Sequence, residues 1–265
     1  MSGFTSDWLA LREPLDLAAR NQTVEQAFLN ALPSTTPKIM DLASGAGSSV
    51  AALSRQIPSP SSWLLTDYDP DLLKIAETRH KKRIGCSIST RQIDLAENLE
   101  TLPFSDVDAV TTSAFLDLVS EEFLTRLVER VVVAGKPFLA SLTYDGRTEC
   151  GPADPFDSVL FGALNQHQHT DKGFGPALGP DAAKRAVEMF EEKGFEVVQG
   201  SSDWHVLVER RDFLGEFLRG CLRVGYELKL DPDQLKHWWN QRLKQIEAGE
   251  LTMIISHLDF VVLPK

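Results

Sequence analysis

The stretch KIMDLASGAGS, residues 38–48, joins an apolar run directly to a glycine-rich turn. Residues 38–43 have the composition of a buried strand, and the pattern after them predicts a helix that starts in the turn and covers residues 45–56. Glycines at such a turn let the backbone approach a ligand closely, and the free amides at the start of a helix can face polar ligand groups. The stretch therefore predicts a strand–turn–helix unit built around a ligand.

A second strand and an acidic residue follow this unit. Residues 63–67 read WLLTD, and Asp67 stands 20 residues after Gly47. A carboxylate at this strand end can accept hydrogen bonds from ribose hydroxyls. Asp69 competes for that role, but it precedes Pro70 and is better used as the N-cap of a helix that runs to about residue 83. We therefore expect a nucleoside to bind at Asp67.

Apolar and helical patterns continue to alternate along the chain. Further strands are predicted at residues 87–95, 108–115, 137–144 and 251–263, with a sixth or bent strand at 195–198 and 203–208. Further helices are predicted at residues 120–133, 181–193, 212–228 and 232–247. The alternation predicts an α/β fold, a doubly wound sheet of about seven strands that is mostly parallel, with its last strand antiparallel, in a single domain.

Two segments are expected to be inserted into this domain. Residues 145–180 are rich in Gly, Pro, Asp, Asn, Gln and His and show little periodicity. A loop this long is uncommon in a compact domain unless it is functional. We therefore expect residues 145–180 to form an active-site loop, and the helical pair within residues 212–248 to cover the active site together with it.

The glycine turn resembles the first motif of the class I S-adenosylmethionine-dependent methyltransferases, and the chain is most similar to bacterial enzymes of the small-molecule type. The family pattern is acid-x-Gly-x-Gly-x-Gly. Asp41, Gly45 and Gly47 match it, and Ala43 stands at the first glycine position. The resemblance implies a Rossmann-like fold and S-adenosylmethionine as the cofactor.

Two further motifs extend the resemblance. Residues 67–73 are similar to the second motif, whose acid binds both ribose hydroxyls. Residues 92–95 are similar to the third, whose acid bonds the adenine amino group while the next residue flanks the ring. Together with the strand end at residue 113, the resemblance implies a cofactor site made of Asp41, Ala43, Ser44, Gly45, Gly47, Asp67, Tyr68, Asp94, Leu95 and Ser113.

Other interpretations of these motifs stay open. Asp41 either positions the methionine amino group or orients the turn, and Asp94 is either an adenine contact or an ordinary strand-end residue. A non-catalytic regulatory protein that binds an adenosyl nucleoside would keep the same turn. An NAD-dependent oxidoreductase would use a similar turn and acid, but its Gly-x-Gly-x-x-Gly spacing is absent, since SSV follows Gly47.

Contacts to the methyl acceptor are predicted from two segments. Residues 113–117 follow the fourth strand, at the sheet edge where open α/β folds bind ligands. Residues 165–176 (NQHQHTDKGFGP) concentrate donors, acceptors and a cation, although they could also be a solvated loop. Candidate catalytic groups are His167, His169 and Asp117. Candidate acceptor contacts are Phe115, Asn165, Lys172, Phe174 and Trp204, with Lys172 placed to receive an anionic group.

Charge and spacing argue against several other partners. The net charge of −11 disfavours nucleic acid, whose binding needs a basic face. The densest basic run, residues 79–83, is interpreted as a solvated helix face. His167, His169 and Asp171 are spaced like metal ligands, but Lys172 follows them. Because a cation beside a metal is unfavourable, no metal site is expected.

The sequence predicts a cytoplasmic protein without a membrane span. No apolar run reaches the roughly 18 residues that a spanning helix requires, and the N-terminus lacks the pattern of a secretory signal. Three widely spaced cysteines fit a reducing compartment better than a disulfide framework. Nothing in the sequence indicates an oligomeric state. The expected activity is methyl transfer to an oxygen, nitrogen or sulfur of a small molecule.

Overall fold

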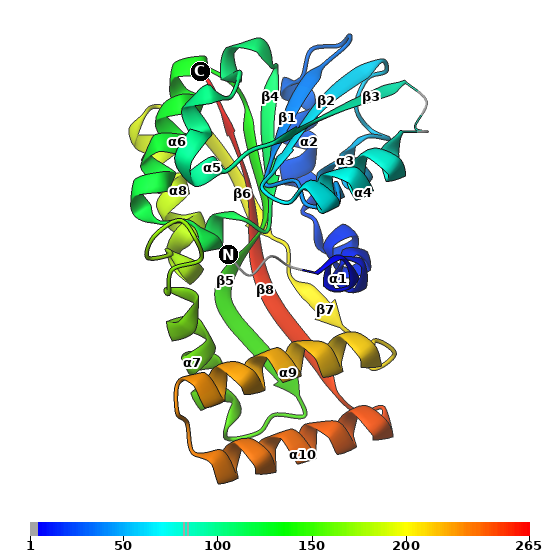
Figure 1. Cartoon of the computed structure of the whole chain (residues 1–265), viewed down its shortest axis with the longest axis vertical. Coiled ribbons are helices and arrows are strands. Elements are labelled where there is room, and N and C mark those ends of the chain that lie inside the picture. The colour runs from blue at the N-terminus through cyan, green and yellow to red at the C-terminus, as the bar shows by residue number, and fades with distance from the viewer. Residues whose placement is uncertain (1–4, 82, 84) are drawn as a thin grey trace.

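The computed structural model describes residues 5–81, 83 and 85–265, and a twisted sheet with helices on both faces forms its centre (Figure 1). The strands are β1 (Lys38–Leu42), β2 (Ser61–Asp67), β3 (Cys86–Gln92), β4 (Ala109–Ser113), β5 (Phe138–Gly151), β6 (Glu196–Ser201), β7 (Trp204–Val206) and β8 (Thr252–Leu263). Their order is β3-β2-β1-β4-β5-β8-β6, with β7 paired to β8. β1 to β5 are parallel, and β8 is antiparallel to its neighbours. The predicted doubly wound, mostly parallel sheet is confirmed.

Ten α-helices surround the sheet in the described part of the chain. They are α1 (Ser6–Ala19), α2 (Gln22–Ala31), α3 (Ser48–Leu53), α4 (Pro70–His80), α5 (Leu95–Asn98), α6 (Glu121–Ala134), α7 (Asp157–Gln168), α8 (Ala182–Glu192), α9 (Arg211–Glu227) and α10 (Pro232–Ala248). None of these helices is long and apolar enough to cross a membrane. Helices α2, α3 and α4 cover one face of the sheet, and α6 and α8 cover the other.

The central strand β1 shows why both faces are covered. Successive side chains of a strand point to opposite faces. Ile39 therefore packs among residues of α2, α3 and α4, whereas Met40 and Leu42 pack among residues of α6 and α8. All three side chains are buried, with exposures of 0–1%. Because both faces of β1 are buried, only the residues at its carboxyl end can reach a ligand. The turn after β1 lies at that end, at the edge of the sheet.

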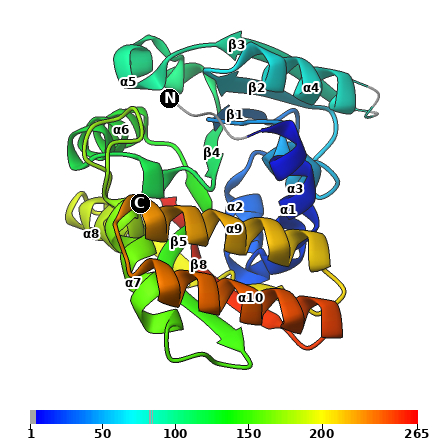
Figure 2. The same ribbon diagram turned by 60° about the horizontal axis from the view of Figure 1, so that its bottom comes forward.

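Beyond the parallel core, β5 and β8 continue as a long antiparallel ribbon, against which α7, α9 and α10 pack (Figures 1 and 2). The irregular loop expected at residues 145–180 is therefore wrong for its first half, since β5 runs on to Gly151 and α7 covers residues 157–168. The sequence of α7 shows only a weak helical periodicity, because polar residues interrupt its apolar positions. Leu160 and Phe161 are nevertheless buried in the same cluster as Phe213 of α9.

The N-terminal helices α1 and α2 are the elements that sequence patterns missed. Thr5 caps α1 by accepting a 3.2 Å bond from the Trp8 amide, and Asn21 caps α2. Pro14 lies inside α1 and hides its helical pattern. The Asn21 amide also donates to the buried Asp259 carboxylate of β8 at 2.9 Å. These contacts hold α1 beside the carboxyl ends of the parallel strands.

Candidate active site

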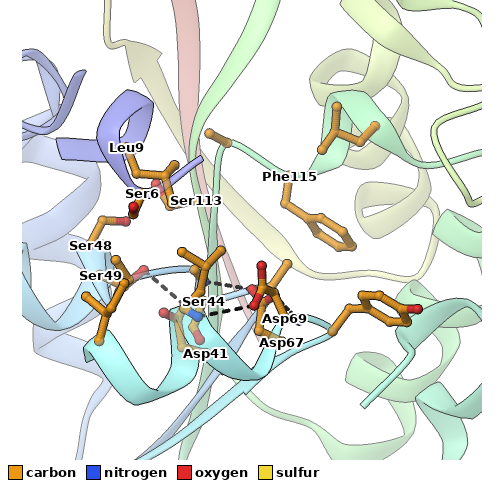
Figure 3. Close-up of a pocket in the computed structure, with 18 of the residues that line it drawn as sticks. Ser6, Leu9, Asp41, Ser44, Ser48, Ser49, Asp67, Asp69, Ser113 and Phe115 are labelled. Atoms are coloured by element: carbon orange, nitrogen blue, oxygen red, sulfur yellow. Dashed lines mark hydrogen bonds between the residues drawn. The ribbon is translucent and has the colours of Figure 1, made fainter. Parts of the chain in front are cut away.

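The carboxyl ends of β1, β2 and β4 open into a cavity of about 560 Å³. Figure 3 shows its labelled walls: Asp41 and Asp67 lie at the strand ends, Phe115 lies across from them, and Ser6 and Leu9 approach from α1. Among the described residues, none of α9 or α10 lines this cavity. The cover expected from residues 212–248 is thus provided by α1 instead.

The turn after β1 adopts the left-handed backbone conformation that a close approach to a ligand requires. Gly45 and Gly47 have φ values of 52° and 82°. Ala43, at the family's first glycine position, also has a positive φ of 49°. This conformation is sterically strained for an alanine, and strained residues are often found at functional sites. Ala43, Ser44 and Gly45 line the cavity, whereas Gly47 lies behind them at the start of α3.

Asp41 is a buried carboxylate with one satisfied and one unsatisfied oxygen. Its Oδ1 accepts hydrogen bonds from the Ser49 hydroxyl at 2.9 Å and the Thr111 hydroxyl at 2.7 Å. Its Oδ2 is buried without a hydrogen-bond partner. Burial raises the pKa of Asp41 to about 7, against the lowering effect of the two hydroxyls. An orphaned oxygen on the cavity wall fits a cationic group of the ligand, such as the methionine ammonium of S-adenosylmethionine.

Asp67 joins the glycine turn to the turn before α4. Its two carboxylate oxygens accept hydrogen bonds from the amides of Gly45 at 2.8 Å and Asp69 at 2.9 Å. Burial raises the pKa of Asp67. Asp69 instead caps α4 by accepting from the Asp71 amide at 2.8 Å, as the sequence predicts. Each Asp67 oxygen keeps a second lone pair, so the carboxylate can also accept the two ribose hydroxyls.

Three more of the predicted cofactor residues belong to the cavity wall. Tyr68, Asp94 and Leu95 line it together with Ile75. Asp94 caps α5 by accepting a 3.0 Å bond from the Ala96 amide. Leu95 is buried and Tyr68 is 55% exposed. Apolar walls with two carboxylates at the rim fit a purine ring whose amino group and ribose point toward acceptors.

Several cavity residues come from parts of the chain without a sequence motif. Arg12 and Asp16 of α1 line the cavity and form a 3.1 Å ion pair. Arg20, at the end of α1, donates to the Ser113 hydroxyl oxygen at 3.1 Å. Ser113 can therefore donate its own proton into the cavity. The sequence does contain a signal for helix α1, namely Thr5 as a cap followed by apolar residues at positions 8, 11 and 15. This pattern predicts a helix but does not indicate that the helix contributes to a site.

Phe115, Phe174 and Lys172 also line the cavity. The rings of Phe115 and Phe174 are 5.3 Å apart in an edge-to-face arrangement. The Lys172 ammonium donates to the Thr170 hydroxyl at 2.9 Å and to the His167 carbonyl at 3.1 Å. Burial lowers the pKa of Lys172. Three of the predicted acceptor contacts are thus brought together beside Ser113.

The two candidate histidines lie outside the cavity lining. His167, on α7, turns its Nε2 toward Glu227 of α9 at 3.2 Å, and burial lowers its pKa. His169 directs its Nδ1 to the Ala177 carbonyl at 3.2 Å. Because α7 is a helix rather than part of a loop, its side chains are committed to packing α7 against its neighbours. Among the described lining residues there is no histidine.

Asp117, Asn165 and Trp204 are also absent from the described lining. Asp117 is buried behind Phe115, and burial raises its pKa to about 6. Asn165 accepts from the Tyr144 hydroxyl at 2.9 Å and donates to the Gly146 carbonyl at 2.7 Å. Trp204 is 4% exposed and packs against other rings. These three residues are therefore not placed to contact a ligand in the cavity.

Comparison with known proteins agrees with this geometry. Residues 39–137 match the model of the methyltransferase domain family. No curated protein sequence matches the chain. In structure, the chain is similar to a Bacillus halodurans C-125 protein assigned as a methyltransferase, with 16% identity, a TM-score of 0.52 and coverage of 93% of this chain and 97% of that one.

A second similar structure is the cyclopropane synthase MmaA2 of Mycobacterium tuberculosis, with 11% identity, a TM-score of 0.55 and coverage of 98% and 94%. Likeness at these identities shows the fold, and the family match covers the glycine turn, Asp67 and Asp94. The glycine turn, Asp67 and Asp94 therefore lie in the segment that matches a methyltransferase domain, and the chain as a whole shares the fold of these solved structures.

Proposed function

We propose that the protein transfers the methyl group to a small molecule that combines an apolar body with an anionic group. The observation that carries this proposal is the presence of Phe115, Phe174 and Lys172 in the cavity wall. The two rings offer faces and edges to an apolar or aromatic body. A partly buried lysine attracts an anion more strongly than an exposed one, because less water screens its charge.

The residues of the cavity act mainly by positioning. When bound, the cofactor would supply an electrophilic methyl group, whose carbon would bond to the lone pair of the acceptor while the sulfonium sulfur would leave as a neutral thioether. Asp41 and Asp67 hold the two ends of the cofactor, while Lys172 and the phenylalanines hold the acceptor. Helix α1 closes the cavity and excludes water. Alignment of two bound reactants can supply about 7–11 kcal/mol of the barrier reduction.

This arrangement does not depend on a histidine base. A nucleophile that arrives unprotonated, or that loses its proton readily, needs no dedicated base. The cavity wall offers the carboxylate of Asp16, whose pKa burial raises, but no imidazole among its described residues. We therefore propose a nitrogen, oxygen or sulfur nucleophile held beside Ser113, with positioning as the main source of rate.

Replacement of Lys172 by methionine tests the proposed acceptor class. Transfer from labelled S-adenosylmethionine is measured against pairs of small acceptors that differ only in a carboxylate or phosphate. We expect the wild type to prefer the anionic member, and Lys172→Met to raise its KM about tenfold, the value of one charge-assisted contact. Affinity for S-adenosylhomocysteine should stay unchanged.

The matched control is Lys184→Met, which removes a lysine of α8 whose side chain is 81% exposed. It should leave both KM values unchanged. Equal use of charged and neutral acceptors by the wild type, with no effect of Lys172→Met, would show that the anionic group is wrong. Absence of transfer to every acceptor of the panel, despite cofactor binding, would contradict the small-molecule proposal itself.

A further inference from the structure

The basic run at the end of α4, residues 79–83, makes several contacts with other parts of the protein. Arg79 pairs with Glu13 of α1 at 2.6 Å. His80 has no exposed surface. Arg83 donates to the Ser54 hydroxyl at 2.7 Å. The expectation of a solvated helix face is wrong for His80, which is buried, and for Arg83, which is partly buried, whereas Arg79 and Lys81 are exposed. Lys82 lies outside the described part of the chain.

His80 makes one hydrogen bond through each ring nitrogen. Its Nδ1 lies 2.9 Å from Arg83 Nε, and its Nε2 lies 3.0 Å from the Gly47 carbonyl oxygen. Arginine can only donate, so Nδ1 must be the acceptor and the ring proton must reside on Nε2. His80 therefore donates to Gly47. Burial and the neighbouring arginines lower the pKa of His80 to about 4, so this neutral form persists at neutral pH.

Gly47 is the residue on which the cofactor turn and α3 join. Its carbonyl also accepts the Ala51 amide at 3.1 Å, which begins the helical bonding of α3. A Cβ at Gly47 would lie 2.8 Å from the His80 ring, so the ring and the turn are in direct contact. Two residues further on, the Ser49 hydroxyl donates to Asp41. The position of Gly47 therefore sets both the turn amides and the donor that faces Asp41.

We propose that His80, held in one tautomer by Arg83, is a positioning residue for cofactor binding. Arg83 sets the tautomer of His80 through its hydrogen bond to Nδ1. His80 in turn holds the carbonyl of Gly47, which accepts the first helical hydrogen bond of α3. Since Arg83, three residues beyond the end of α4, also donates a hydrogen bond to Ser54 at the end of α3, His80 and Arg83 together contact α3 at both ends. The cofactor then meets a turn that is already ordered, and less of its binding energy is lost in ordering the loop. This inference rests on the cofactor and not on the proposed acceptor.

The variants His80→Phe and His80→Gln separate the hydrogen bond from the packing. Phenylalanine keeps a ring against Gly47 but cannot donate, whereas glutamine keeps an N–H near the position of Nε2. Affinity for S-adenosylhomocysteine is measured by calorimetry at pH 8. We expect His80→Phe to weaken binding about tenfold and His80→Gln less than about threefold, as for the loss and retention of one buried hydrogen bond.

Arg83→Leu provides a second variant at a position that is only partly buried. It should weaken binding about threefold, because the ring is then free to occupy either tautomer. Nitrogen NMR of the His80 ring should show the Nε2–H form alone in the wild type and a mixture in Arg83→Leu. A purely structural role of Arg83 would not change the tautomer.

Val128→Ala is the control for lost stability. Val128 is buried in α6 on the opposite face of the sheet, so this variant should lower the melting temperature and leave the affinity unchanged. Wild-type affinity in a folded His80→Phe protein would overturn the inference. Equal weakening by phenylalanine and glutamine would also overturn it, because the donated hydrogen bond would then not matter.

Discussion

Asp41→Asn is expected to weaken S-adenosylhomocysteine binding and, at the same time, to stabilise the cofactor-free protein. The variant keeps an oxygen for the Ser49 and Thr111 hydroxyls but replaces the orphaned Oδ2 by an amide. The NH2 group of that amide only donates, so it cannot accept a hydrogen bond from an ammonium group. Loss of one charge-assisted bond should weaken binding roughly 10- to 100-fold at pH 8, as measured by calorimetry.

The gain in stability follows from the raised pKa of Asp41. Its folded pKa of about 7 exceeds the ordinary aspartate pKa of 3.8. The folded state therefore binds a proton that the unfolded state releases between these values, and the free energy of unfolding falls as the pH rises through this range. Ionising the buried group costs on the order of 4 kcal/mol. Asparagine removes this cost but is itself desolvated, so we expect a net gain of about 2 kcal/mol at pH 8.

Denaturant unfolding at pH 8 and at pH 4 measures this gain. The difference should favour Asp41→Asn at pH 8 and should reverse in favour of the wild type near pH 4, where wild-type Asp41 is protonated in the folded state and partly protonated in the unfolded state. Asp106→Asn, which removes an exposed carboxylate remote from the cavity, should change neither binding nor the pH dependence. A destabilised Asp41→Asn protein at pH 8 would mean that the carboxylate only orients the turn.

Asp67→Ala is expected to cause the largest loss of cofactor affinity. The variant removes two acceptors for the ribose hydroxyls and also the bonds that tie the Gly45 and Asp69 amides together. Two charge-assisted hydrogen bonds correspond to at least about 100-fold in the dissociation constant of S-adenosylhomocysteine. Calorimetry gives the affinity, and circular dichroism shows whether the variant is folded.

Asp69→Asn is the matched control for this variant. Asparagine caps a helix as well as aspartate does, so α4 should keep its start and binding should stay within about threefold. Comparing the two variants shows which of the two candidate acids, Asp67 or Asp69, binds the ribose. A larger effect at Asp69 than at Asp67 would reverse their assignment.

Local patterns predicted the cofactor half of the molecule well. The strand β1, its glycine turn, the Asp69 cap and the acid at the end of β2 are each determined by neighbouring residues, so a short window contains the information. The left-handed φ of Ala43 shows that the turn geometry survives without a glycine at that position. The match to the methyltransferase domain family covers the same part of the chain.

The acceptor half depends on contacts between distant segments, and local patterns predicted it poorly. Helix α1 becomes a wall of the cavity through the Arg79–Glu13 ion pair and the Arg20–Ser113 bond, which join residues far apart in sequence. His167 has a polar sequence context, but tertiary packing turns it toward Glu227. In the same way, His80 contacts Gly47 and Arg83 contacts Ser54, and neither long-range contact can be read from a local pattern.

Calorimetric titration of the purified protein with S-adenosylhomocysteine and, separately, with NAD tests the central claim most directly. We propose that the cavity under α1 binds an adenosyl cofactor through Asp41 and Asp67. We predict one saturable site per chain for S-adenosylhomocysteine and no heat of binding for NAD. Binding of NAD without binding of S-adenosylhomocysteine would contradict the assignment of the cofactor and, with it, the methyl-transfer activity.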